Sequence, residues 1–139
     1  MRQLLLLLVA TLVAGCQTPL PPVDPQMAWV DFSTPTPGGK VLMAERLDKQ
    51  RLNDGRYFQV TPGSHELRVR FDFEVFGGGG ALMTGPVERL CYLYIRYDHF
   101  EAGQRYVLEG RSLGFTPSAR LYNAKREIVA EDRDYNCIM

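Results

Sequence analysis

The chain has 139 residues, with 16 basic and 16 acidic side chains, and therefore carries no net charge near neutral pH. This balance excludes a strongly basic nucleic-acid-binding protein and a domain held on anionic lipid by charge alone. Hydrophobic residues make up 45% of the sequence, which is enough for one domain with a core of its own.

The N-terminal segment has the layout of a secretory signal. Arg2 supplies a positive charge, an apolar run extends from Leu4 to Ala14, and the small residue Gly15 precedes Cys16. The apolar run has about 11 residues, whereas a membrane-spanning helix needs roughly 20. We therefore expect residues 1–15 to be a signal peptide that is removed from the mature chain.

The four residues Val13-Ala14-Gly15-Cys16 resemble a bacterial lipobox. The resemblance implies that the Cys16 thiol is lipidated and that acyl chains anchor the mature chain in the lipid bilayer. Gln17, where an aspartate would signal retention, favours the outer membrane by resemblance to the sorting rules of such lipoproteins. The alternative is an ordinary soluble signal peptide in which Cys16 is incidental.

Residues 16–26 contain four prolines and no apolar periodicity, so they are expected to form an extended tether. The folded domain is then expected to span residues 27–139. Together these features predict a lipid-anchored protein of the outer membrane whose domain faces the periplasm.

Lipidation of Cys16 would leave Cys91 and Cys137. An even number of cysteines in an oxidising compartment predicts one disulfide, which would constrain the unfolded chain by roughly 4 kcal/mol in the entropic model. The alternative is a buried free thiol at Cys91, which is in register with Leu93 and Ile95 along a predicted strand.

Two segments alternate clearly between apolar and polar residues. From Glu66 to Val75 the odd-numbered residues are apolar and the even-numbered ones charged, which predicts a half-buried antiparallel strand. Leu90 to Tyr97 is a second strand. Weaker candidate strands are Met27–Phe32, Lys40–Glu45, Tyr57–Val60, Gln104–Glu109, Ala119–Tyr122 and Glu127–Ala130.

Turn residues separate these segments, and Pro62-Gly63 suits the central positions of a type II turn. A short helix is compatible with only one segment, Leu42 to Leu52. The sequence therefore predicts an all-β fold, an antiparallel β-sandwich of about seven or eight short strands.

Pro62 to Val69, followed later by Ala102 to Tyr106, resembles the small PEGA-like β-sandwich domains of bacterial lipoproteins. The resemblance covers about residues 40–110, although the Pro-Glu-Gly-Ala signature itself is absent. It implies a surface or periplasmic module that binds or supports other envelope components, usually without catalysis.

No residue set predicts an active site. Gly110 to Gly114 fits the nucleophile-elbow pattern around Ser112, but Pro117 follows closely and no histidine comes after His99. His65 and His99 lack the spacing of metal ligands, and a structural role is expected for His65. We therefore predict no enzyme activity, no metal and no cofactor.

Two groups of residues are candidates for partner binding. Phe76, Leu82 and Met83 flank or lie in the glycine-rich loop at Gly77–Gly80, which is expected either to fold back over the domain or to contact a partner. Tyr92, Tyr94 and Arg96 share a polar strand face, which Arg68 and Arg70 would join if the two strong strands pair. The plain alternative for that face is a solvated surface with cross-strand pairs.

The sequence thus favours a non-catalytic lipoprotein that acts as a structural or protein-binding module of the cell envelope. Its expected partners are the lipid bilayer, through acylated Cys16, and another envelope protein or peptidoglycan, and no nucleic acid. A carbohydrate- or peptidoglycan-binding module is the first alternative, and a minor hydrolase is the second.

Overall fold

The computed structural model describes residues 15, 18–35, 40–76 and 85–138. These residues contain nine strands and no helix, which confirms the all-β class. Strands β5 and β6, at 14 and 15 residues, are much longer than the short strands expected. The strands are β1 (Ala28–Ser33), β2 (Lys40–Leu47), β3 (Gln50–Arg51), β4 (Phe58–Val60), β5 (Gly63–Phe76), β6 (Pro86–Phe100), β7 (Arg105–Leu113), β8 (Thr116–Tyr122) and β9 (Ile128–Ile138).

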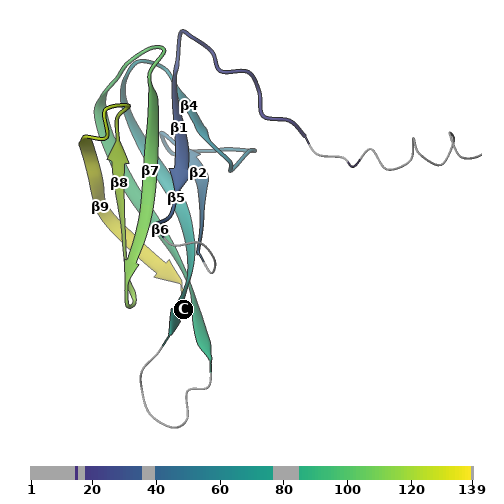
Figure 1. Cartoon of the computed structure of the whole chain (residues 1–139), viewed down its shortest axis with the longest axis vertical. Coiled ribbons are helices and arrows are strands. Elements are labelled where there is room, and N and C mark those ends of the chain that lie inside the picture. Colours follow the sequence, from purple (N-terminus) through teal and green to yellow (C-terminus); the bar gives the residue numbers. More distant parts are fainter. Residues whose placement is uncertain (1–14, 16–17, 36–39, 77–84, 139) are drawn as a thin grey trace, which may run out of the picture.

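All nine strands belong to one open sheet with the order β3-β2-β5-β6-β9-β8-β7-β1-β4. Figure 1 shows β9, β8, β7 and β1 in this order from left to right. The prediction of seven or eight strands was too low, because the two-residue strand β3 gave no periodic signal. The sheet is mixed, since β1 lies parallel to β7 while the other neighbouring strands are antiparallel. The purely antiparallel arrangement expected from the sequence therefore fails at β1.

Strand β9 joins the two halves of the sheet. Its first part pairs with β8, where Ala130 lies opposite Leu121, and its last part pairs with β6, where Asn136 lies opposite Tyr92. Where β9 leaves β8, the Asp132 carboxylate accepts a hydrogen bond of 2.7 Å from the backbone N–H of Ala119. A side-chain acceptor thus replaces a backbone acceptor at the point where β9 changes its neighbouring strand.

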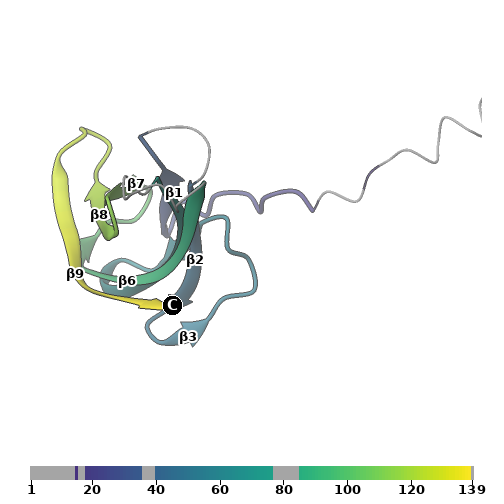
Figure 2. The same cartoon turned by 90° about the horizontal axis from the view of Figure 1, so that it is seen from below.

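The sheet curls so that its two halves face each other, as the view from below shows (Figure 2), and the buried side chains of both halves form one hydrophobic core. Along β5 the apolar side chains expected to point inward are buried, from Leu67 to Val75, and the charged ones between them are not. Gly110 of β7 faces Leu42 of β2 and Phe71 of β5, and a Cβ atom placed there would meet both side chains at 3.3 Å. The absence of a side chain at Gly110 therefore lets the two halves approach closely.

The helix considered at Leu42–Leu52 is not present, and that alternative was wrong. Strand β2 runs to Leu47, and a two-residue hairpin turn leads into β3. Asp48 and Lys49 both have positive φ, at 48° and 71°, as a type I′ turn requires. The segment has no glycine at this turn, so its composition gave no warning of a hairpin.

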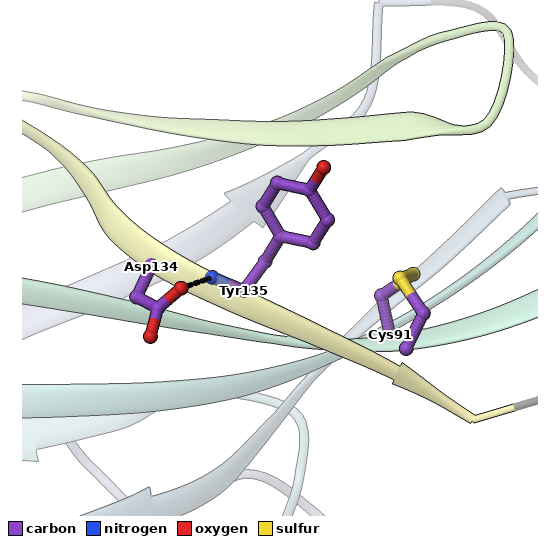
Figure 3. Close-up of a disulfide and its surroundings, with 4 residues drawn as sticks. Cys91, Asp134 and Tyr135 are labelled. Carbon is purple, nitrogen blue, oxygen red and sulfur yellow. Dashed lines mark hydrogen bonds between the residues drawn. A yellow bond between two sulfur atoms is a disulfide. The ribbon is translucent and has the colours of Figure 1, made fainter.

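The disulfide between Cys91 and Cys137 is confirmed, with an S–S distance of 2.03 Å (Figure 3). The two cysteines lie directly opposite each other on β6 and β9, with Cα atoms 4.0 Å apart. Cys91 is fully buried between the two halves of the sheet, in the same row as Leu93. The bond therefore fixes the last strand to the centre of the sheet.

Several predictions fall outside the described residues: most of the signal peptide, the lipidated Cys16, and the loop with Gly77–Gly80, Leu82 and Met83. Phe76 is the last residue of β5, where it pairs with Pro86. Gly63, the second residue of the predicted turn, has the expected positive φ of 108°. Within the described ranges, no helix is long and apolar enough to cross a membrane.

Candidate functional site

Strands β5 and β6 are neighbours, which is the pairing needed to bring the arginines of β5 beside the tyrosines of β6. Arg68 lies opposite Tyr94, and Arg70 lies opposite Tyr92. Directly opposite residues of an antiparallel pair point to the same side, so these four side chains share the outer surface of the sheet. We call this surface the tyrosine–arginine face and define it by Arg68, Arg70, Tyr92 and Tyr94.

Arg68 is the centre of the tyrosine–arginine face. Its guanidinium carbon lies 4.4 Å from the ring centroid of Tyr92 and 5.4 Å from that of Tyr94, both within cation–π range. Its Nε lies 2.9 Å from Oε2 of Glu45 on β2, an ion pair without the alignment of a hydrogen bond. Arg68 and Glu45 are only 24% and 23% exposed, so three strands hold this group in place.

Arg70 is held by its own strand. Its guanidinium donates to both carboxylate oxygens of Asp72, with Nη2 2.9 Å from Oδ2 and Nε 3.0 Å from Oδ1. These hydrogen bonds are the main reason that the pKa of Arg70 is raised. The charges on this face are therefore balanced in pairs, and the face carries no excess of either sign around its centre.

A pocket of about 500 Å³ adjoins the tyrosine–arginine face at the end nearest the C-terminus. Val41 and Ile138 border it and are 52% and 55% exposed, which is high for large aliphatic side chains. The charged residues around it are balanced, three basic and three acidic. Its lining is Lys40, Val41, Arg70, Asp72, Phe73, Glu74, Glu88, Arg89, Leu90 and Ile138.

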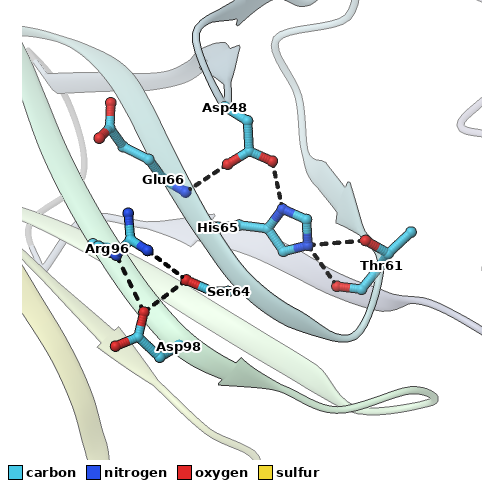
Figure 4. A network of polar contacts seen from close by, with 7 residues as sticks. All are labelled: Asp48, Thr61, Ser64, His65, Glu66, Arg96 and Asp98. Atoms are coloured by element: carbon cyan, nitrogen blue, oxygen red, sulfur yellow. Dashed lines mark hydrogen bonds and ion pairs between the residues drawn. The ribbon is translucent and has the colours of Figure 1, made fainter.

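Arg96, the third candidate on β6, lies further along the same strand and belongs to a separate polar network (Figure 4). Its Nη2 donates to Oγ of Ser64 at 2.9 Å, and its Nε donates to Asp98 at 3.1 Å. The Ser64 hydroxyl also donates to Asp98, at 2.7 Å. Hydrogen bonds from Ser64 and then Arg96 hold the pKa of Asp98 below its usual value. Arg96 is thus engaged within the domain.

His65 has the structural position expected of it (Figure 4). Its Nδ1 lies 2.6 Å from Oδ2 of Asp48, and its Nε2 lies 2.7 Å from the backbone oxygen of Thr61. Asp48 also accepts a hydrogen bond from the backbone N–H of Glu66, at 2.8 Å. The His65 side chain is only 12% exposed, so this network ties the β2–β3 turn to the start of β5.

The surroundings of Ser112 differ from those of a nucleophile elbow. Ser112 lies within β7, opposite Pro117 of β8, and a hairpin turn at Gly114 follows. A nucleophile elbow needs a strand, a sharp turn and then a helix. Among the described residues, no group of three or more His, Cys, Asp or Glu side chains is placed to hold a metal ion.

The sequence predicted the four residues that define the tyrosine–arginine face, but not the residues of β2 and β9 that lie beside them. Glu45 was overlooked because only the pairing of β2 with β5 brings it beside Arg68. Val41 and Ile138 gave no signal, because only the strand order β2-β5-β6-β9 brings them together.

Comparisons with known proteins found no matching family model, no similar curated protein and no similar solved structure.

Proposed function

We propose that this protein is a lipid-anchored, non-catalytic module of the bacterial outer membrane that docks a protein partner through the tyrosine–arginine face. In this proposal the mature chain begins at lipidated Cys16, and its domain faces the periplasm. The two halves of the curled sheet act as the layers of a β-sandwich, as in the PEGA-like domains that the sequence resembles.

The observation that carries the docking proposal is the position of Arg68 over the rings of Tyr92 and Tyr94, with Glu45 beside it. Tyrosine and arginine are enriched among the residues that dominate protein–protein binding energy. Side chains that are already ordered lose less conformational entropy on binding. The adjoining pocket, with half-exposed Val41 and Ile138, offers a place for an apolar side chain of the partner.

A protein partner fits this face better than a sugar does. Sugar rings stack on open aromatic faces, whereas the Arg68 guanidinium already lies against Tyr92 and close to Tyr94. Peptidoglycan binding at this face is therefore the second candidate. Pull-down with isolated sacculi tests it, because binding that is lost in a Tyr92→Ala, Tyr94→Ala double variant would favour it over a protein partner.

The anchor is tested separately from the face. Cys16→Ser should abolish incorporation of labelled palmitate and leave an uncut precursor. Mass spectrometry of the mature wild-type N-terminus should find it at residue 16 with acyl chains attached. A mature N-terminus at any other residue would contradict the lipoprotein assignment.

Docking is tested by placing a photocrosslinking amino acid at Tyr92 in the full chain and irradiating intact cells. Tyr135 is the matched control, because it lies opposite Leu93 on the other side of the same sheet and is 41% exposed. We expect a discrete crosslinked protein from position 92 that is absent from position 135 and reduced by Arg68→Ala. Equal crosslinking from both positions would refute docking at this face.

A further inference from the structure

A second pocket, separate from the tyrosine–arginine face, opens at the end of the sheet where the chain enters the domain. It has a volume of about 250 Å³ and lies between the β6–β7 turn and the β8–β9 turn, both at the top of the molecule in Figure 1. Tyr97, Tyr106, Gln104 and Asn123 line it. We call it the end pocket.

The walls of the end pocket are fixed. Gly103 of the β6–β7 turn donates to the backbone oxygen of Met27 at 2.9 Å, and the backbone oxygen of Gln104 accepts from Trp29 at 3.1 Å. On the other side, Oδ1 of Asn123 accepts from the backbone N–H groups of both Lys125 and Glu127 at 3.0 Å. The pocket is therefore formed by two ordered turns.

The floor of the end pocket is aromatic. Tyr97 packs edge to face against buried Phe100, with ring centroids 4.9 Å apart, and Tyr106 does the same at 5.1 Å. Burial raises the pKa of both tyrosines, so both phenols keep their protons at neutral pH. Each can then donate a hydrogen bond to a ligand.

Some polar groups in the end pocket can still form hydrogen bonds with a ligand. Within the described part of the chain, the hydroxyl of Tyr97 and the side-chain amide of Gln104 have no hydrogen-bond partner in the protein. The Tyr106 oxygen accepts from the backbone N–H of Glu101 at 3.1 Å, which leaves its proton free to donate. On the tyrosine–arginine face, in contrast, the arginines are already paired with carboxylates.

The charge and size of the end pocket narrow the ligand class. Glu101 and Glu127 outnumber Lys125 at its rim, which disfavours phosphate and other anions. Its volume is below the roughly 300–1,000 Å³ of pockets that take drug-sized molecules, so it suits one small unit of a ligand. Sugar hydroxyls both donate and accept, as the amide and phenol groups here do.

We propose that the end pocket binds a single uncharged sugar residue, free or at the end of a glycan chain, with Tyr97 and Gln104 as the main hydrogen-bonding groups. The pocket lies where the tether joins the domain, because the β6–β7 turn is bonded to the start of β1. This site does not depend on docking at the tyrosine–arginine face, which lies on the outer surface of the sheet.

The test is a titration of the full chain in lauryldimethylamine oxide micelles, which carry no sugar head group, followed by NMR chemical shifts. The probes are chitotriose, maltotriose and, as a peptide control, diglycine. We expect saturable shifts of residues around Tyr97 and Gln104 with at least one sugar. Tyr97→Phe, which keeps the ring, and Gln104→Ala, which keeps the backbone bond to Trp29, should each weaken binding roughly 3- to 10-fold.

Tyr135→Phe on β9 is the matched control, because Tyr135 is exposed and lines neither pocket, and it should bind the sugar like the wild type. The proposal is overturned if neither sugar binds or if diglycine alone binds. It is also overturned if Tyr97→Phe and Gln104→Ala both bind as tightly as the wild type while their amide spectra show an intact fold.

Discussion

The Asp132 carboxylate lies 2.7 Å from the backbone nitrogen of Ala119 and accepts its hydrogen bond. Ala119 is 1% exposed, so in the folded protein its backbone N–H depends on this side-chain acceptor. We expect Asp132→Ala to lower the free energy of unfolding by about 1–3 kcal/mol, the cost of leaving a buried donor unsatisfied. Urea denaturation measures the change.

Asp132→Asn is the control for this prediction, because its side-chain oxygen still accepts a hydrogen bond while its charge is gone. It should lose clearly less stability than Asp132→Ala. Equal losses in the two variants would show that the carboxylate's charge matters more than its role as an acceptor.

The disulfide predicts a large effect on stability. Reduction, or replacement of Cys91 and Cys137 by Ala, should lower the free energy of unfolding by roughly 4 kcal/mol in the entropic model, because 46 residues of sequence separate the cysteines. A thiol assay on the unreduced, denatured protein should find neither Cys91 nor Cys137 free. Detection of both thiols would contradict the bond.

Close packing at Gly110 predicts that this position rejects larger residues. Gly110→Val should cost about 1–3 kcal/mol, because the added carbons would meet Leu42 and Phe71, which belong to the opposite half of the sheet. Ser118→Val is the matched control and should cost clearly less. Ser118 lies on the neighbouring strand β8, opposite Arg111, and is only half-buried. If both variants melt at the same temperature, the halves are less tightly packed than described.

Two aspartates, Asp31 and Asp48, accept hydrogen bonds from neighbouring side chains, and from this we predict that acid weakens the fold. The hydrogen bond from Arg105 is the main reason that the pKa of Asp31 is lowered. Burial acts to raise the pKa of Asp48, but hydrogen bonds from the Glu66 backbone and from His65 outweigh it and lower the pKa overall. A lowered folded-state pKa gives stability that is present above the unfolded value of about 3.9 and is lost as pH falls through the folded value.

We therefore expect the urea midpoint to fall as the pH drops below about 4, and to fall less steeply in Asp31→Asn. Asp134→Asn is the control, because Asp134 makes no ion pair among the described residues and bonds only to the next backbone nitrogen. The same acid slope in wild type and Asp31→Asn would show that the Arg105 pair contributes nothing to this dependence.

Local pattern predicted much of this structure. The alternation along Glu66–Val75 placed the buried and exposed sides of β5 correctly, and the strand with Cys91 was found for the same reason. The pairing of Cys91 with Cys137 followed from counting cysteines. These features depend on residues close together in sequence or on simple chemistry.

The features that failed depend on contacts between distant residues. The parallel pairing of β1 with β7 cannot be read from either strand, because alternation gives a strand its buried side and not its neighbour. Glu45 joins the tyrosine–arginine face only because β2 lies beside β5. The end pocket was missed because it lies between two separate turns, β6–β7 and β8–β9. No local pattern shows that these turns lie side by side in the folded sheet.

The position of β9 also sets an order for the assembly of the domain. It is the last of the nine strands in the chain, yet it lies between β6 and β8, near the middle of the sheet. During synthesis the earlier strands emerge first, and β6 and β8 each keep an unpaired edge until Ile128–Ile138 follows. Only then do the halves join and Cys91 meet its partner, so this domain cannot close before β9 has emerged.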